Sequence, residues 1–254
     1  MGPAPTEVER LRGLLDEALD ASLRPLRSLP RPLGILFSGG VDSSLLAWEL
    51  RNEPGVALYT LGSEGSHDLT AGREGAKRLG LPWQPLRVGG HELRAAETRC
   101  SEELSGLPPV IRTVLLALAV AIEEAPALEL VLGQGADELF LGYAHYRNRP
   151  AEEVERRSRE DLARLHGTDW PRTQRIAQRY GKEVSAPYLT PTFEASAQEV
   201  PIALRLPRDD PKRFFREWAV ARGLPRELAD RAKKAVQYGS GVDALVRSWA
   251  KRPH

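Results

Sequence analysis

The sequence predicts an α/β protein built on an open, mostly parallel sheet flanked by helices, with a largely helical C-terminal part. Short apolar runs, which fit strands buried on both faces, alternate with helical patterns up to about residue 149. Two glycine-bearing turns, at Gly39 and Gly133, directly follow two of these runs. Ligands of such sheets bind outside the carboxyl ends of the strands, so these turns mark the expected site.

The first helix is signalled by "TEVE" at Thr6–Glu9, which fits a capping box, and it ends at "RSLPRP" because proline removes a backbone donor. Strands are expected at "LGILF", "VALYTLG", "PLRVG" and "LELVLG". Helices are expected at "SSLLAWEL", "LTAGREGAKRLG", about Pro109–Glu124 and "GADELFLGY". Strands that alternate with helices imply parallel pairing through right-handed crossovers.

After about Arg149 the pattern changes to charged helices broken by prolines, and no convincing strand follows. Nothing at this point has the composition of a flexible linker. We therefore expect a single domain over residues 1–254, made of an N-terminal helix (1–30), an α/β core (31–149) and a mostly helical subdomain (150–254).

Composition excludes several classes of protein. With 41% hydrophobic residues the chain can bury a sizeable core, and 36 basic against 35 acidic residues argue against a nucleic-acid-coating protein. Cys100 is the only cysteine, which favours a structural thiol in a reducing compartment. The N-terminal segment has no basic stretch followed by an apolar core, so we expect no signal peptide, and the apolar stretch at 114–122 is too short to span a membrane. We therefore expect a cytoplasmic protein without a membrane partner.

The motif "SGGVDSS" at 38–44 carries the first chemical signal. Glycines let a backbone approach a ligand, and a turn into a helix presents unpaired amides to an anion. The common phosphate-binding loop has a lysine near this point, and this one does not. Asp42 would repel a phosphate, but it makes sense if it holds a divalent cation that bridges to the phosphates. A turn with mere capping residues is the plain alternative, which the preceding buried strand disfavours.

"SGGVDSS" matches the SGGxDS signature of the PP-loop ATP pyrophosphatases, which cleave ATP between the α and β phosphates. This resemblance implies that ATP and magnesium are used. It also implies a set of ATP- and pyrophosphate-binding residues: Leu36, Ser38, Gly39, Gly40, Asp42, Ser43, Ser44, and Leu61 against the adenine.

"VLGQGADELFLGY" at 131–143 resembles the asparagine synthetase segment S-G-E-G-A-D-E-L-F-G-G-Y. Gly133 and Gly135 again allow close backbone approach, and Asp137 and Glu138 fall in the first turn of a helix. Capping alone would also explain the two carboxylates. The resemblance implies a magnesium held jointly by Asp42 and Asp137.

A third segment, "RAKKAVQYGSGV", resembles the one that carries the catalytic lysine in asparagine synthetases and β-lactam synthetase. It implies that Lys233, with Lys234 as the alternative, stabilises charge during acyl transfer. A solvated basic pair is the other reading. "GKEVSAPYLT" is similar to the family's G-x-E-V-R-x-P-F-L-D, but Ser185 replaces the arginine and Thr190 the aspartate, which suggests an acceptor pocket unlike that for aspartate.

Two departures from the family bear on the substrate. The chain is too short for the glutaminase domain of the glutamine-dependent enzymes, so we expect free ammonia, another amine, or a separate amidotransferase subunit. Gln134 replaces a glutamate implicated in handling the acyl-adenylate; it keeps hydrogen bonding but loses basicity. Either Glu138 takes over as base, or the substrate differs, or the protein binds ATP without efficient turnover.

The resemblance, which covers roughly 34–242, therefore implies an ATP- and magnesium-dependent ligase. It would adenylate a carboxylate and pass the acyl group to ammonia or an amine, with Lys233, Glu138 and Gln134 as catalytic residues. The alternatives are an ATP-binding regulatory or partner subunit with altered catalysis, and a tRNA-modifying enzyme of the same fold, which the near-zero net charge disfavours. Assembly into a homo-oligomer stays open.

Overall fold

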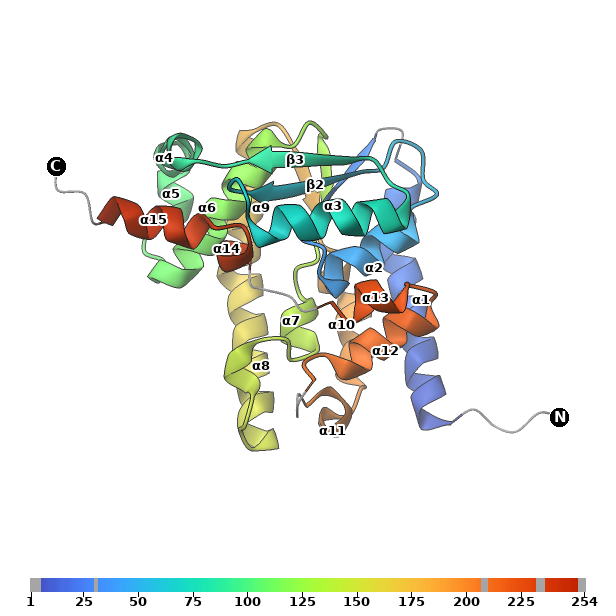
Figure 1. Ribbon diagram of the computed structural model, residues 1–254. Helices are drawn as coiled ribbons and strands as arrows, with labels where there is room; N and C mark the ends of the chain where they lie inside the picture. The colour runs from blue at the N-terminus through green and yellow to red at the C-terminus, as the bar shows by residue number, and fades with distance from the viewer. Residues whose placement is uncertain (1–5, 30–31, 207–209, 232–235, 251–254) are drawn as a thin grey trace.

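The computed structural model describes residues 6–29, 32–206, 210–231 and 236–250. Five strands form one sheet in the order β3-β2-β1-β4-β5, and every neighbouring pair is parallel. The predicted open α/β sheet is thereby confirmed (Figure 1). The strands are β1 (Leu33–Leu36), β2 (Ala57–Gly62), β3 (Trp83–Arg87), β4 (Glu129–Val131) and β5 (Glu183–Ser185).

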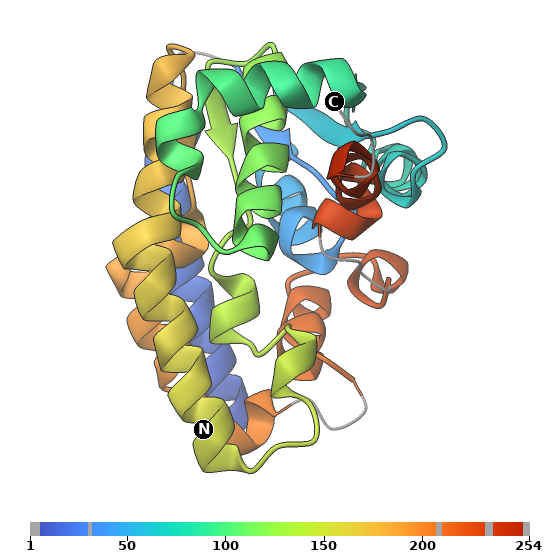
Figure 2. The same ribbon diagram turned by 90° about the vertical axis from the view of Figure 1, so that its left-hand side faces the viewer.

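Helices surround the sheet and make up most of the C-terminal part, as predicted (Figures 1 and 2). Up to residue 149 they are α1 (Glu7–Arg27), α2 (Val41–Leu50), α3 (His67–Leu79), α4 (Gly90–Arg99), α5 (Ser101–Leu104), α6 (Pro109–Glu124), α7 (Ala136–Leu139) and the 3₁₀ turn η1 (Ala144–Tyr146). Beyond it follow α8 (Ala151–Arg164), the π-helical turn η2 (Leu165–Asp169), α9 (Trp170–Arg179), η3 (Pro187–Leu189), α10 (Pro191–Gln198), α11 (Ile202–Arg205), α12 (Arg213–Ala221), α13 (Arg226–Ala229), α14 (Val236–Gly239) and α15 (Val242–Ala250).

The expectation that no strand follows residue 149 is wrong, because β5 extends the sheet beyond β4. Three residues at a sheet edge leave almost no periodic signal in the sequence. The strand is fixed by its neighbours instead: the amide of Leu132 donates to the carbonyl of Ser185 (2.9 Å). The buried amino group of Lys182 donates to the carbonyls of Ile122, Glu123 and Ala125 at the end of α6.

Each face of the sheet packs a separate layer of helices. Successive strand side chains point to opposite faces, and Ile35 accordingly joins the core formed with α1, α2 and α3, whereas Leu36 packs with α4, α6 and α9. In the second layer Cys100 is fully buried, and burial raises the pKa of its thiol, in keeping with a structural role. No helix in the described ranges is long and apolar enough to cross a membrane.

The C-terminal helices enter the same core as the first helix. Phe193 of α10, and Phe215 and Trp218 of α12, are fully buried together with Leu11 and Leu15 of α1. Helix α1 begins at the predicted capping box, in which the amide of Glu9 donates to the Thr6 hydroxyl (3.3 Å) and Thr6 donates to the Glu9 carboxylate (2.6 Å). It then runs alongside α10 (Figure 2).

Candidate active site

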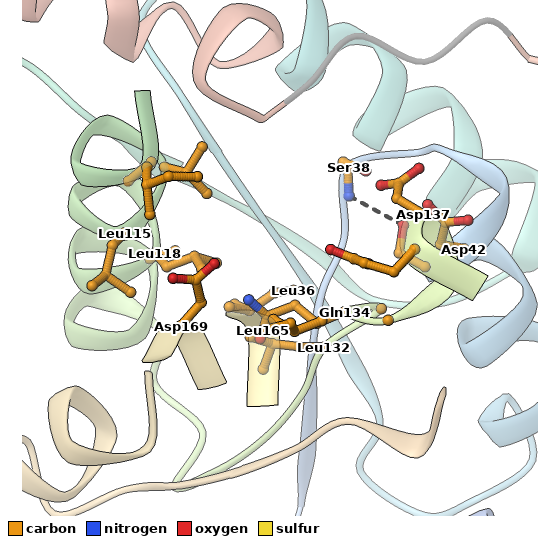
Figure 3. A pocket seen from close by; sticks show the side chains of 18 of the residues that line it. Leu36, Ser38, Asp42, Leu115, Leu118, Leu132, Gln134, Asp137, Leu165 and Asp169 are labelled. Atoms are coloured by element: carbon orange, nitrogen blue, oxygen red, sulfur yellow. Dashed lines mark hydrogen bonds between the residues drawn. The ribbon is translucent and has the colours of Figure 1, made fainter. Parts of the chain in front are cut away.

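A cavity of about 480 Å³ opens at the carboxyl ends of β1, β2 and β4. Most of its exposed wall is apolar and is formed by residues at the strand ends and on α6. The polar groups of the wall come from the two glycine turns and from the segment between α7 and α9. Among the lining residues are Leu36, Ser38, Asp42, Ser43, Leu61, Leu115, Leu118, Leu132, Gly133, Gln134, Gly135, Asp137, Glu138, Tyr143, Leu165 and Asp169 (Figure 3).

The turn after β1 is shaped by glycine and by its own serines. Gly39 has φ of 72°, and a Cβ there would lie 2.9 Å from the carbonyl oxygen of Ala71 in α3, so only glycine fits. The Ser43 hydroxyl accepts from the amide of Ser38 (3.3 Å), and the Ser38 hydroxyl accepts from the amide of Gly40 (3.4 Å). These hydrogen bonds hold the shape of the loop, which leads directly into the first turn of α2.

The turn after β4 lies against the first one because β4 pairs with β1. A Cβ on Gly133 would be only 3.1 Å from the Cβ of Asp42. Gly135 has φ of 96° and faces Leu189, whose Cδ2 would be 2.6 Å from an added Cβ. Because the two turns pack closely, the side chain of Asp137 lies near that of Asp42.

The carboxylates of Asp42 and Asp137 converge on one positive charge, the amino group of Lys212. The Lys212 Nζ lies 2.5 Å from Oδ1 of Asp42 and 2.7 Å from Oδ1 of Asp137, and the lysine side chain is only 4% exposed. Two carboxylate oxygens that meet at one cation suit magnesium, which takes one or two carboxylates together with phosphate oxygens. Within the described ranges no cluster of three or more His, Cys, Asp or Glu side chains is placed to hold a metal ion.

Glu138 faces the cavity as a buried carboxyl group. It accepts a hydrogen bond from the hydroxyl of Tyr143 (2.6 Å), and its backbone carbonyl accepts from the Ser158 hydroxyl of α8 (2.9 Å). Burial, assisted by the negative charge of Asp137, raises the pKa of Glu138 to about 7. A carboxyl group with this pKa can both take up and release a proton near neutral pH.

Two buried side-chain oxygens in the cavity wall have no hydrogen-bond donor among the described residues. Among the described residues, no group donates a hydrogen bond to Oε1 of Gln134 or to Oδ1 of Asp169, and both atoms are buried. Asp169 is placed by the π-helical turn between α8 and α9, a feature often found at functional sites. Burial raises its pKa, although the Arg164 guanidinium lies 3.4 Å from its second oxygen.

The opposite part of the cavity is apolar. Leu36 and Leu61 from the strand ends face Leu115 and Leu118 of α6, and Figure 3 shows the α6 leucines across the cavity from Ser38, Asp42 and Asp137. Ligand pockets are commonly lined by apolar side chains with a few polar groups that orient the ligand. That the adenine of ATP lies against this wall stays a prediction.

The predicted residues fall into three groups. Leu36, Ser38, Asp42, Ser43, Leu61, Gly133, Gln134, Gly135, Asp137 and Glu138 line the cavity. Gly39 and Gly40 lie in the turn after β1 and Ser44 lies in the first turn of α2; all three are buried and are not part of the lining. Lys233 and its alternative Lys234 lie outside the described residues.

The segment expected to shape the acceptor pocket lies elsewhere. The Ser185 hydroxyl is 3.3 Å from the Glu129 carboxylate, and the Thr190 hydroxyl accepts from the amide of Phe193 at the start of α10. Neither residue lines the cavity. This segment contributes Tyr188, which is fully buried. Its hydroxyl donates to the backbone carbonyl of Asp42 (2.9 Å) and so stabilises the start of α2.

Sequence reasoning missed three residues of the site: Lys212, Tyr143 and Asp169. Tyr143 ends the quoted "GADELFLGY" and could have been found by its five-residue distance from Glu138. Lys212 and Asp169 had no local signal, because they stand in charged, proline-interrupted stretches that read as surface.

Comparisons with known proteins show the family of the chain. The family model "Asparagine synthase" matches residues 10–158 and 148–252. The chain is 30% identical to a putative glutamine-hydrolysing asparagine synthetase of Methanocaldococcus jannaschii, covering 96% of this chain and 52% of that protein. It is 28% identical to the asparagine synthetase of Cricetulus griseus, covering 96% and 46%.

The chain thus spans about half the length of the curated relatives it matches. Among solved structures it is similar to the U34-tRNA thiolase NcsA of Methanococcus maripaludis, at 15% identity and a TM-score of 0.37 over 89% of this chain and 82% of that one. The family match extends over both glycine turns and the C-terminal helices. The chain belongs to the asparagine synthase family.

Proposed function

We propose that the protein is an ATP-dependent, AMP-forming ligase that joins a carboxylate to ammonia or an amine. The observation that carries this proposal is the convergence of Asp42 and Asp137 at one point beside two glycine turns. The adjoining apolar wall provides room for the base of ATP. Family membership supports the same class of reaction.

The reaction has two steps. An oxygen of the substrate carboxylate attacks the α phosphorus of ATP, the bond from this phosphorus to the bridging oxygen of the β phosphate breaks, and pyrophosphate leaves. The amine then attacks the acyl carbon, AMP leaves with the bonding pair, and the amine gives up a proton. Positioning of the reactants and stabilisation of charge supply most of the acceleration in such transfers.

The first step would use the two glycine turns. The amides after β1 and the hydroxyls of Ser38 and Ser43 would bind pyrophosphate at the start of α2. Asp42 and Asp137 would hold a magnesium ion, which supplies positive charge against the phosphate oxygens. Lys233, which the resemblance assigns to charge stabilisation, would act in the second step.

The second step needs a group that accepts a proton, and Glu138 fits that role. Its carboxylate faces the cavity, and Tyr143 holds one of its oxygens in place. One oxygen each of Gln134 and Asp169 has no donor in the part of the chain that the structure describes, which supports a substrate that brings N–H donors, as ammonia, an amine or an ammonium group would. Ammonia could be supplied free or by a separate amidotransferase subunit.

The experiment that tests the proposal is a product assay. The protein is incubated with ATP, magnesium, ammonium ion or an amine, and a panel of amino acids and other carboxylates, and AMP, ADP and pyrophosphate are measured. We expect AMP and pyrophosphate in equal amounts, dependent on both carboxylate and amine. ADP as the product would overturn the proposal.

Replacing Glu138 by glutamine is expected to slow acyl transfer by about 10²-fold, because glutamine cannot accept a proton. Glutamine still accepts the hydrogen bond from Tyr143, so ATP binding should stay unchanged. Single-turnover rates of amide formation check this. Glu103→Gln serves as the matched control, since Glu103 is equally buried, pairs with Arg179 and lies outside the cavity lining. An unchanged rate in Glu138→Gln would exclude Glu138 as the base.

A second candidate function is favoured by Gln134, which replaces the family's glutamate. It is an ATP-binding regulatory or partner subunit with altered catalysis. Tight binding of ATP, without AMP release for any acceptor in the panel, would favour this alternative over the ligase.

A further inference from the structure

Lys212 occupies the point that the two proposed magnesium ligands share. Its Nζ lies within 2.5 Å of Asp42 and 2.7 Å of Asp137, bonded to one oxygen of each. A lysine ammonium and a divalent cation cannot both occupy the point between the two Oδ1 atoms, because two cations at this distance repel each other strongly. A metal ion held by both Oδ1 atoms therefore requires Lys212 to move.

The backbone conformation and the packing around Lys212 hold its side chain in this position. Its backbone φ is 62°, a left-handed conformation that residues other than glycine seldom adopt, so the surrounding structure must hold it there. It directly precedes α12, which Phe215 anchors in the core. Gly142 leaves the space through which the side chain passes: a Cβ on Gly142 would be 2.3 Å from Cε of Lys212 and 2.0 Å from Oδ1 of Asp137.

Moving the ammonium has an electrostatic consequence. A buried ion pair that loses one partner leaves an uncompensated charge, which is strongly unfavourable. A free divalent cation would restore positive charge to Asp42 and Asp137, but the displaced Lys212 ammonium would lose the two carboxylates that pair with it. ATP with its metal removes this difficulty, because the metal takes the carboxylates while the triphosphate takes the ammonium.

We infer that Lys212 is a positioning residue that holds Asp42 and Asp137 together and keeps divalent cations out until a nucleotide arrives. Metal and nucleotide then bind as a coupled pair, and by linkage each increases the affinity for the other by the same factor. The inference rests on the proposed function, since it takes the two aspartates as metal ligands and a nucleotide as their partner.

The first test is binding of manganese, a spectroscopic substitute for magnesium, to the full chain. Free Mn²⁺ is counted by electron paramagnetic resonance with and without α,β-methylene-ATP, which resists cleavage between the α and β phosphates, and the Mn²⁺ that the analogue itself chelates is measured without protein and subtracted. We expect Mn²⁺ affinity to rise at least about tenfold when the analogue is present. Equal affinity with and without the analogue would overturn the inference while leaving the ligase proposal standing.

The second test is Lys212→Met, which keeps the length of the side chain and removes its charge. We expect affinity for Mn²⁺ alone to rise by about tenfold or more and the coupling to the nucleotide analogue to fall by a similar factor. Lys212→Arg, which keeps the charge, should bind Mn²⁺ alone as weakly as the wild type. Lys77→Met changes an exposed lysine of α3 and is the control for loss of charge in general.

The two kinds of failure can be told apart. If neither Mn²⁺ nor the nucleotide analogue binds to the wild-type chain, the proposed function fails and the inference fails with it. If Lys212→Met binds Mn²⁺ alone no better than the wild type, the lysine does not exclude the metal and the inference alone is overturned. Should Lys212→Met fail to fold, the wild-type measurement still decides.

Discussion

Replacing Asp42 by asparagine is expected to reduce AMP formation by about 10³-fold or more, which corresponds to about 4 kcal/mol of lost transition-state stabilisation. Asparagine keeps the shape and one oxygen but lacks the negative charge that a magnesium ion needs. Asp42 is 3% exposed and lies in the first turn of α2, directly after the glycine turn that follows β1. Initial rates of pyrophosphate release at saturating ATP measure the effect.

The fold should tolerate this change, because Lys212 keeps its second partner, Asp137. Circular dichroism and the unfolding midpoint are therefore expected to match those of the wild type closely. Asp20→Asn in α1 is the control, since Asp20 is about half exposed and pairs with Arg222 outside the cavity. A rate for Asp42→Asn within about tenfold of the wild type would show that the aspartate does not hold a required metal.

Replacing Trp218 by alanine is expected to destabilise the protein by about 3–5 kcal/mol, a large part of the stability of a typical domain. The indole is fully buried between Phe193 and Phe215, with ring centroids 6.0 and 5.4 Å away, and its N–H donates to Asp16 of α1 (2.8 Å). Alanine would leave a cavity where α1, α10 and α12 meet. Urea unfolding followed by circular dichroism measures the loss.

Two variants make this prediction specific. Trp218→Phe keeps most of the ring contacts and loses the hydrogen bond to Asp16, so a smaller loss of about 1–2 kcal/mol is expected. Leu204→Ala removes a side chain that is 38% exposed and should change stability by less than about 1 kcal/mol. If Trp218→Ala cost no more than Leu204→Ala, α12 would not be part of the common core.

Local sequence was enough for the α/β core and for the two turns of the site. Strands buried on both faces are mostly apolar, which allowed β1 and β4 to be predicted. Ligands of parallel sheets bind at the carboxyl ends of the strands, which allowed the glycine turns after these two strands to be predicted as the site. Asp42 and Asp137 were recognised because each stands at a fixed short distance from its glycines. The backbone conformation of these two turns depends on their glycines, so a short sequence motif is enough to predict it.

Tertiary structure alone decided the rest. Lys212 reaches Asp42 across 170 positions of sequence, and a lysine beside a proline in a charged stretch carries no sign of burial. Asp169 enters the cavity only because a π turn shifts the helix register, and the edge strand β5 exists only because β4 is there to pair with it. The two glycine turns of the candidate site could be read from the local sequence. Contacts between distant segments decided which charges meet there, because such contacts depend on packing and not on local conformational preference.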